Sequence, residues 1–192
     1  MKIDYYLAKR HYNNGIYCGD TGMVKEFDDK VFAAVIDALG HGKNAHELAE
    51  ICTNFLAENY RQKLIEMMEK LHQYIRGSRG VVASLCLVDM KKSTFSHVSV
   101  GDTTVRKLNN DRSRGYSMPG IIGYQMRSLQ EKTMKLDDSD IIILHTDGIP
   151  SHFNQRAEGI LQGDARAIAC NIIAQFSKKH DDALCIILRC MK

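Results

Sequence analysis

Short apolar runs, each bounded by Asp, Gly, Ser or Lys, recur along the chain. Runs of this kind that are rich in β-branched residues are typical of strands. Their apolarity is continuous rather than alternating, which favours strands that are covered on both faces. We predict strands at Ile3–Ala8, Val31–Ile36, Val81–Val88, Phe95–Val100, Val105–Leu108, Ile141–Leu144 and Leu184–Leu188.

Three segments carry apolar residues at the spacing of one helix face, and we predict helices over 45–56, 64–75 and 165–176. The first two helices follow one another between groups of strands. This order favours a layered α+β architecture over a doubly wound parallel sheet, in which strands and helices alternate. The polar tract Asn109–Gly115 is predicted to be an exposed loop. No repeat or linker divides the chain, so we expect a single domain over residues 1–192.

The composition is that of a soluble globular protein, with 44% hydrophobic and 26% charged residues. The formal net charge of +3 is small and is not concentrated in runs, so neither nucleic acid nor a membrane is expected as a partner. No apolar run reaches the roughly 20 residues that a spanning helix needs. The N-terminus, Met1–Tyr6, lacks the apolar core of a secretory signal. We therefore expect a cytoplasmic protein, and a monomer.

The cysteines are spaced singly, without a Cys-x-x-Cys pair, and most lie in apolar stretches. They indicate reduced, buried thiols rather than a disulfide framework or a zinc site. No Cys-x₅-Arg phosphate loop is present, which argues against a cysteine phosphatase. The six are Cys18, Cys52, Cys86, Cys170, Cys185 and Cys190.

Aspartates recur where predicted strands end or begin, mostly beside glycine or alanine. Any one of them could simply cap a turn. Gathered at one edge of a sheet, they would form an all-oxygen cluster, which selects Mg²⁺ or Mn²⁺ over zinc. Two such ions can hold a phosphate and activate a water. The aspartates are Asp20, Asp37, Asp102, Asp147 and the pair Asp181–Asp182.

Four motifs resemble, in the same order, those of the bacterial PP2C-type (PPM) phosphatases. They are Asp37-Ala-Leu-Gly-His-Gly42, Gly101-Asp-Thr103, Thr146-Asp-Gly-Ile149 and Asp181-Asp-Ala-Leu184. Thr-Asp-Gly alone would carry little weight, whereas four motifs in register over most of the chain form a strong signal. Cys18-Gly-Asp20 and Arg79-Gly80 resemble in particular the RsbX-like branch of the SpoIIE/RsbU/RsbX group.

The resemblance implies a four-layer αββα sandwich of the α+β class, with two antiparallel sheets flanked by helices. It implies a metal-dependent protein serine/threonine phosphatase that uses two Mn²⁺ or Mg²⁺ ions. Its substrates would be phosphorylated stressosome scaffold proteins of the STAS-domain type, as negative feedback in bacterial stress signalling. The implied metal ligands are Asp20, Asp37, the backbone carbonyl of Ala38, Asp102, Asp147 and Asp181. Asp37 would bridge both ions, and Asp102 would mark a weaker third position.

The chain departs from the family pattern at Ala38, where relatives usually have Gly, and at Leu184, where many have Thr. A carbonyl ligand at Ala38 requires backbone angles that suit a residue with a Cβ atom. His41 is a candidate general acid that protonates the leaving serine oxygen. An equal alternative is that His41 packs at the entrance of the first predicted helix. The loop Gly40–Gly42 could also be an anion site at that helix N-terminus.

Two alternatives differ from the leading hypothesis in function or in substrate. The chain could be a phosphoprotein-binding module that is catalytically weak or inactive, because Ala38 and Leu184 depart from the pattern. It could also be the same enzyme acting on an anti-sigma-factor antagonist outside any stressosome.

Overall fold

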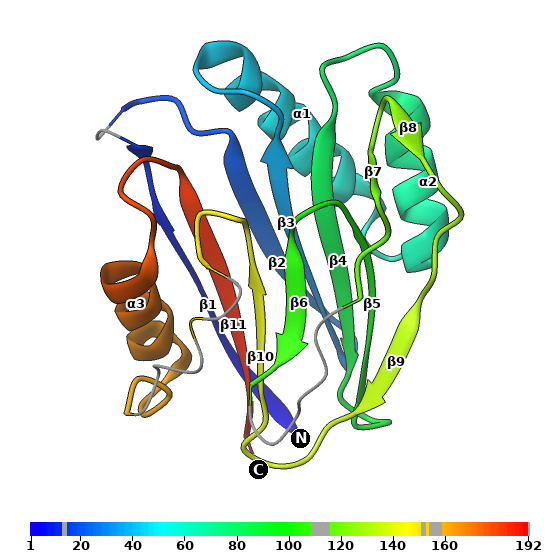
Figure 1. Ribbon diagram of the computed structural model, residues 1–192. Helices are drawn as coiled ribbons and strands as arrows, with labels where there is room; N and C mark the ends of the chain where they lie inside the picture. The colour runs from blue at the N-terminus through cyan, green and yellow to red at the C-terminus, as the bar shows by residue number, and fades with distance from the viewer. Residues whose placement is uncertain (13–14, 109–115, 151–152, 154–158, 192) are drawn as a thin grey trace.

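The computed structural model describes residues 1–12, 15–108, 116–150, 153 and 159–191. The longer strands in this part of the chain form two antiparallel sheets (Figure 1). In spatial order, the first sheet contains β1 (Lys2–Arg10), β11 (Ala183–Met191), β10 (Ile141–His145) and β6 (Thr104–Lys107). The second contains β2 (Asp20–Phe27), β3 (Lys30–Ala38), β4 (Val81–Asp89), β5 (Thr94–Val100) and β9 (Lys132–Lys135). A small hairpin is formed by β7 (Gly120–Ile121) and β8 (Gln125–Met126).

Helices cover the outer face of each sheet. Helices α1 (Lys43–Asn59) and α2 (Leu64–Tyr74) pack on the second sheet, and α3 (Ala165–Phe176) packs on the first (Figure 1). Three clusters of buried apolar side chains fill the spaces between the layers: one under each helical layer and one between the two sheets. The result is the predicted αββα sandwich of two antiparallel sheets flanked by helices.

The strand β3 shows why the apolar runs are continuous. Phe32, Ala34 and Ile36 belong to the cluster under α1 and α2, whereas Val31 and Val35 belong to the cluster between the sheets. Successive side chains of a strand point to opposite faces, and here both faces are buried. An apolar residue is therefore needed at every position and not only at alternate ones.

All the predicted strands and the three predicted helices are confirmed, with shifts of a few residues at their ends. The strands β2, β7, β8 and β9 were not predicted. The predicted loop Asn109–Gly115 lies outside the described residues. The thiols are free, and all are buried except that of Cys170. Within the described residues, no helix has both the length and the apolar character needed to cross a bilayer.

Candidate metal and active site

The predicted aspartates lie at strand ends that meet at one end of the sandwich, the upper end in Figure 1. Asp20 begins β2 and pairs in register with Asp37, near the end of β3. Asp102 follows β5, Asp147 follows β10 and Asp181 precedes β11. The antiparallel pairing of β2 with β3 and of β10 with β11 makes the end of one strand meet the start of the next. The topology thus gathers acids that are far apart in the sequence.

Two adjoining cavities open at this end. One, of about 800 Å³, is lined by Asp37, Asp102, Asp147 and Asp181. The other, of about 840 Å³, is lined by Asp20, Asp37 and Asp181, together with the exposed His41. Asp37 and Asp181 border both cavities and therefore lie at their junction.

Burial and mutual repulsion of these carboxylates shift their protonation. Burial, followed by the charge of Asp37, raises the pKa of Asp20 from 3.8 to about 8. Burial and then the charges of Asp147 and Asp181 raise the pKa of Asp37 from 3.8 to about 7. The pKa of Asp181 is raised as well, by burial and by Asp147, and is lowered in part by Lys178. The arrangement therefore favours added positive charge.

The chain itself supplies little of that charge. Among the described residues, Lys178 is the only cation paired with a predicted ligand, with 3.4 Å between its Nζ and Oδ2 of Asp147. Both side chains are about half exposed, so this ion pair contributes little to stability. Within the described part of the chain, the carboxylates of Asp20, Asp37 and Asp181 form no ion pair, although the charge of Lys178 acts on Asp181.

The residues present fit a hard divalent cation. Their donors are oxygens, which suit Mg²⁺ or Mn²⁺. The described residues contain no group of three or more His, Cys, Asp or Glu side chains already arranged to hold one ion. Mg²⁺ is commonly held by only one or two carboxylates and keeps several waters, so such a group is not required.

Two polar residues that sequence reasoning did not name as metal ligands anchor the segments of the site. Thr146 donates from Oγ1 to Oδ2 of the buried Asp20 at 2.6 Å and accepts from the backbone N–H of Leu184 at 3.1 Å. Asp182 accepts from the backbone N–H groups of Tyr12 and Gly19, at 2.8 and 3.0 Å. Both lie within the motifs, but their partners are so distant in sequence that no local pattern could reveal them.

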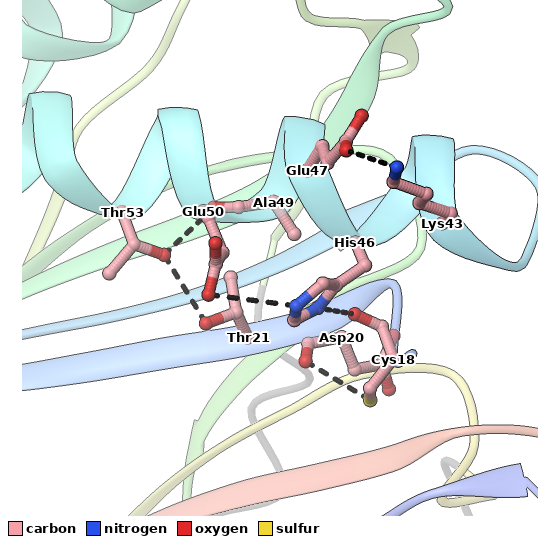
Figure 2. Close-up of polar contacts among 9 residues, drawn as sticks. All are labelled: Cys18, Asp20, Thr21, Lys43, His46, Glu47, Ala49, Glu50 and Thr53. Atoms are coloured by element: carbon pink, nitrogen blue, oxygen red, sulfur yellow. Dashed lines mark hydrogen bonds and ion pairs between the residues drawn. The ribbon is translucent and has the colours of Figure 1, made fainter. Parts of the chain in front are cut away.

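The segment that leads into β2 is tied to helix α1 (Figure 2). Nδ1 of His46 lies 3.1 Å from the carbonyl oxygen of Cys18, and Thr53 donates to the hydroxyl of Thr21 at 3.2 Å. The Sγ of Cys18 donates to the backbone carbonyl of Asp20. These contacts hold Asp20 in place between the helix and the sheet end.

The two departures from the motif cause no visible distortion. Ala38 is a strand residue at the end of β3, and its φ is not positive, so a Cβ atom is accommodated without strain. Leu184 places its side chain in the cluster between the sheets, while its backbone still bonds to Thr146. Neither departure removes a carboxylate.

Gly148 is required by close packing beside Asp147. A Cβ atom there would overlap the backbone oxygen of Asp182 and approach the Cα of Ala183 to 2.9 Å. We expect Gly148→Ala to cost about 1–3 kcal/mol of stability, seen as a melting temperature about 5 °C lower. Activity should fall as well, because Asp147 and Asp181 are forced apart.

Gly77→Ala is a suitable comparison for this prediction, because a Cβ atom there meets nothing within 4 Å and only the positive φ of 86° is strained. It should lower stability and leave activity per folded molecule unaltered. A Gly148→Ala variant with wild-type stability and activity would show that the chain next to Asp147 tolerates displacement.

Comparison with known proteins identifies the family. The sequence profile of SpoIIE, Stage II sporulation protein E, matches residues 28–190. The chain is 27% identical over 135 residues to the phosphoserine phosphatase RsbX of Bacillus subtilis (strain 168), covering 69% of this chain and 67% of RsbX.

Solved structures show the same fold. A chain from a study of the bacterial stressosome as a modular system that controls secondary messenger signaling superposes with a TM-score of 0.90. It is 27% identical, and the match covers 98% of this chain and 100% of that chain. RsbX in complex with magnesium superposes with a TM-score of 0.84 at 19% identity, covering 97% of this chain and 94% of that chain.

Two antiparallel sheets between helical layers, with an oxygen-only acidic cluster at their strand ends, define the class of PP2C-like phosphatases. The chain belongs to the SpoIIE family, whose profile spans most of its length. It is accordingly a metal-dependent protein serine/threonine phosphatase. The family, fold class and enzyme class predicted from the motifs are confirmed.

Proposed function

We propose that this enzyme removes phosphate from phosphoserine or phosphothreonine of stressosome scaffold proteins of the STAS-domain type, as a monomer in the bacterial cytoplasm. Its similarity to the phosphoserine phosphatase RsbX and to a chain from a stressosome study supports this substrate class. The observation that carries the proposal is the meeting of five aspartates from separate strand ends at one edge. Burial and repulsion in this cluster favour bound cations.

Within the proposal, each predicted ligand has a distinct task. Asp37, at the junction of the two cavities, would hold Mn²⁺ or Mg²⁺ together with the backbone carbonyl of Ala38. Asp147 and Asp181 would hold a metal ion as well, Asp20 would lie beside the site, and Asp102 would contribute to a weaker third position. Such ions, when bound, neutralise the phosphate and lower the pKa of a water.

The reaction itself is hydrolysis of the phosphate ester. Water adds to phosphorus, the bond from phosphorus to the serine oxygen breaks, and that oxygen takes up a proton as inorganic phosphate leaves. His41 is the proposed donor of this proton, because its exposed side chain lines the same cavity as Asp20 and Asp37.

Phosphate release from a serine-phosphorylated stressosome scaffold domain tests the proposal. We expect release with Mn²⁺ and none with a chelator. Turnover of a small aryl phosphate without release from the scaffold domain would keep the chemistry and reject this substrate. Inactivity on both, in a protein that is folded and binds Mn²⁺, would reject catalysis and favour a phosphoprotein-binding module.

A further inference from the structure

Three large apolar side chains beside the site are exposed to solvent. Tyr12, Ile16 and Tyr17, between β1 and β2, are 42%, 78% and 40% exposed. A single exposed apolar residue is ordinary on a protein surface. These three, however, line one cavity together with Asp20 and Asp181. We call Tyr12, Ile16 and Tyr17 the apolar rim.

The carboxylate of Asp182 ties both ends of the rim to the catalytic end. Asp182 accepts from the N–H of Tyr12 on one side of the rim and from the N–H of Gly19 on the other, at 2.8 and 3.0 Å. Asp182 directly follows the proposed ligand Asp181 in the chain. The position of the rim relative to the proposed metal site is therefore set by the short segment Asp181–Asp182.

Further contacts position Tyr12 and Tyr17 of the rim before any partner arrives. The ring of Tyr17 packs against His46, with 5.7 Å between ring centroids. His46 in turn bonds to the carbonyl of Cys18 and lies within 3.6 Å of Glu50 on α1 (Figure 2). The N–H of Gly15 donates to the carbonyl of Tyr12 at 2.9 Å. A surface ordered in advance loses less entropy when it binds.

We propose that the apolar rim is a docking surface for an aliphatic or aromatic residue that flanks the phosphorylated serine or threonine of the protein substrate. This inference rests on the proposed phosphatase function. The rim and the aspartates line the same cavity, so a residue next to a bound phosphoserine lies within reach of the rim. An apolar residue there would cover Ile16, whereas an acidic one would face Asp181 and Asp182.

The docking surface should affect the recognition of protein substrates but not that of small ones. A phosphoprotein contacts both the aspartates and the rim, whereas a small aryl phosphate that fills the ion site lacks the flanking residue. Loss of the rim should therefore weaken recognition of the phosphoprotein selectively, and mainly through KM.

Ile16→Ser tests this directly, with Ile51→Ser as a matched control. Ile51 is 46% exposed on α1 and does not line the cavity of the rim. We measure kcat/KM for a serine-phosphorylated scaffold domain and for para-nitrophenyl phosphate in Mn²⁺. The ratio of the first to the second should fall about tenfold in Ile16→Ser and stay within twofold of wild type in Ile51→Ser. An unaltered ratio in Ile16→Ser would overturn the docking surface.

A binding measurement separates this inference from the proposed function. With Mn²⁺ present, the Kd of the unphosphorylated scaffold domain, which keeps the flanking residue and has no phosphate to release, should rise about tenfold in Ile16→Ser. If the wild type binds the domain but never releases phosphate, the proposed function fails, and this Kd still decides the docking surface. If Ile16→Ser leaves the Kd unaltered and instead converts a dimer into a monomer by sedimentation, the rim joins two copies of the chain and the docking inference is wrong.

Discussion

Asp37→Asn is expected to lower kcat/KM for phosphate release by at least about a thousandfold. Asn preserves the shape of the side chain and one of its oxygens, but it removes the negative charge at the junction of the two cavities. Charge stabilisation by catalytic metal ions contributes several kcal/mol, and each 1.36 kcal/mol is a factor of ten in rate. The measurement is phosphate release at saturating Mn²⁺ from both the scaffold domain and para-nitrophenyl phosphate.

The fold should survive this substitution. In the metal-free protein Asp37 is destabilised in its charged form by burial and by Asp147 and Asp181, which is why its pKa is raised to about 7. Asn relieves that repulsion, so the melting temperature in chelator at pH 8 should equal or exceed that of the wild type. Loss of activity could then not be attributed to unfolding.

Asp29→Asn provides the matched control for Asp37→Asn. Asp29 lies between β2 and β3, at the opposite end of the same hairpin, and forms a surface ion pair with Lys91. Such pairs contribute little, so activity should stay within twofold of wild type. If Asp37→Asn kept near-normal activity, Asp37 would not be a bridging ligand and the proposed metal site would be wrong.

The parts of the fold that the sequence predicted well are those where burial is complete. Strands β3, β10 and β11 are apolar at almost every position because layers cover both of their faces. The edge strands of the second sheet, β2 and β9, gave no such signal. In β9, Lys132–Lys135, only Met134 is apolar and the other side chains are exposed. The edge strand β2 mixes buried and exposed positions and contains Gly22, so its pattern fits no single period.

The candidate ligands were predictable for a different reason. Each aspartate stands at the boundary of an apolar run, and boundaries can be seen in a sequence. What could not be seen is which residues support them. The bond from Thr146 to Asp20 and the bonds from Asp182 to Tyr12 and Gly19 join segments at opposite ends of the chain. The pairing of β1 with β11 brings Asp182 to Tyr12, and the packing of the two sheets on one another brings Thr146 to Asp20.

The stability of the metal-free protein should fall as pH rises from about 6.5 to 8.5. The pKa values of Asp20 and Asp37 are about 8 and 7 in the folded protein, against 3.8 ordinarily. In this range the folded protein holds protons that the unfolded chain has lost, so raising the pH favours unfolding. The stabilisation by these protons is complete below about pH 4 and is lost as pH passes the raised pKa values.

Below pH 6.5 two buried histidines have the opposite effect and make the stability of the folded protein rise with pH. Burial lowers the pKa of His97 and of His145 to about 4, so the unfolded chain binds protons there that the folded protein does not. Stability from these two groups rises with pH and is complete above the ordinary value of 6.5. Above pH 6.5 the histidines therefore oppose the carboxylates only weakly.

Added Mn²⁺ should reverse the decline, because the ions bind the deprotonated carboxylates and displace their protons. In chelator, we expect a loss of about 2 kcal/mol between pH 6.5 and 8.5, or about 5 °C in melting temperature. The rise in melting temperature on adding Mn²⁺ should be larger at pH 8.5 than at pH 6.5. Thermal unfolding monitored by circular dichroism measures both quantities.

Asp20→Asn distinguishes this explanation from a general effect of pH. The variant lacks the carboxylate with the higher pKa, so its melting temperature in chelator should decline less between pH 6.5 and 8.5. Asp29→Asn, at the far end of the hairpin, should decline as the wild type does. Two results would contradict this explanation: a wild-type melting temperature that rises over this interval, or a Mn²⁺ effect that is independent of pH. Either would mean that the aspartates at the strand ends repel one another too weakly to draw cations to the site.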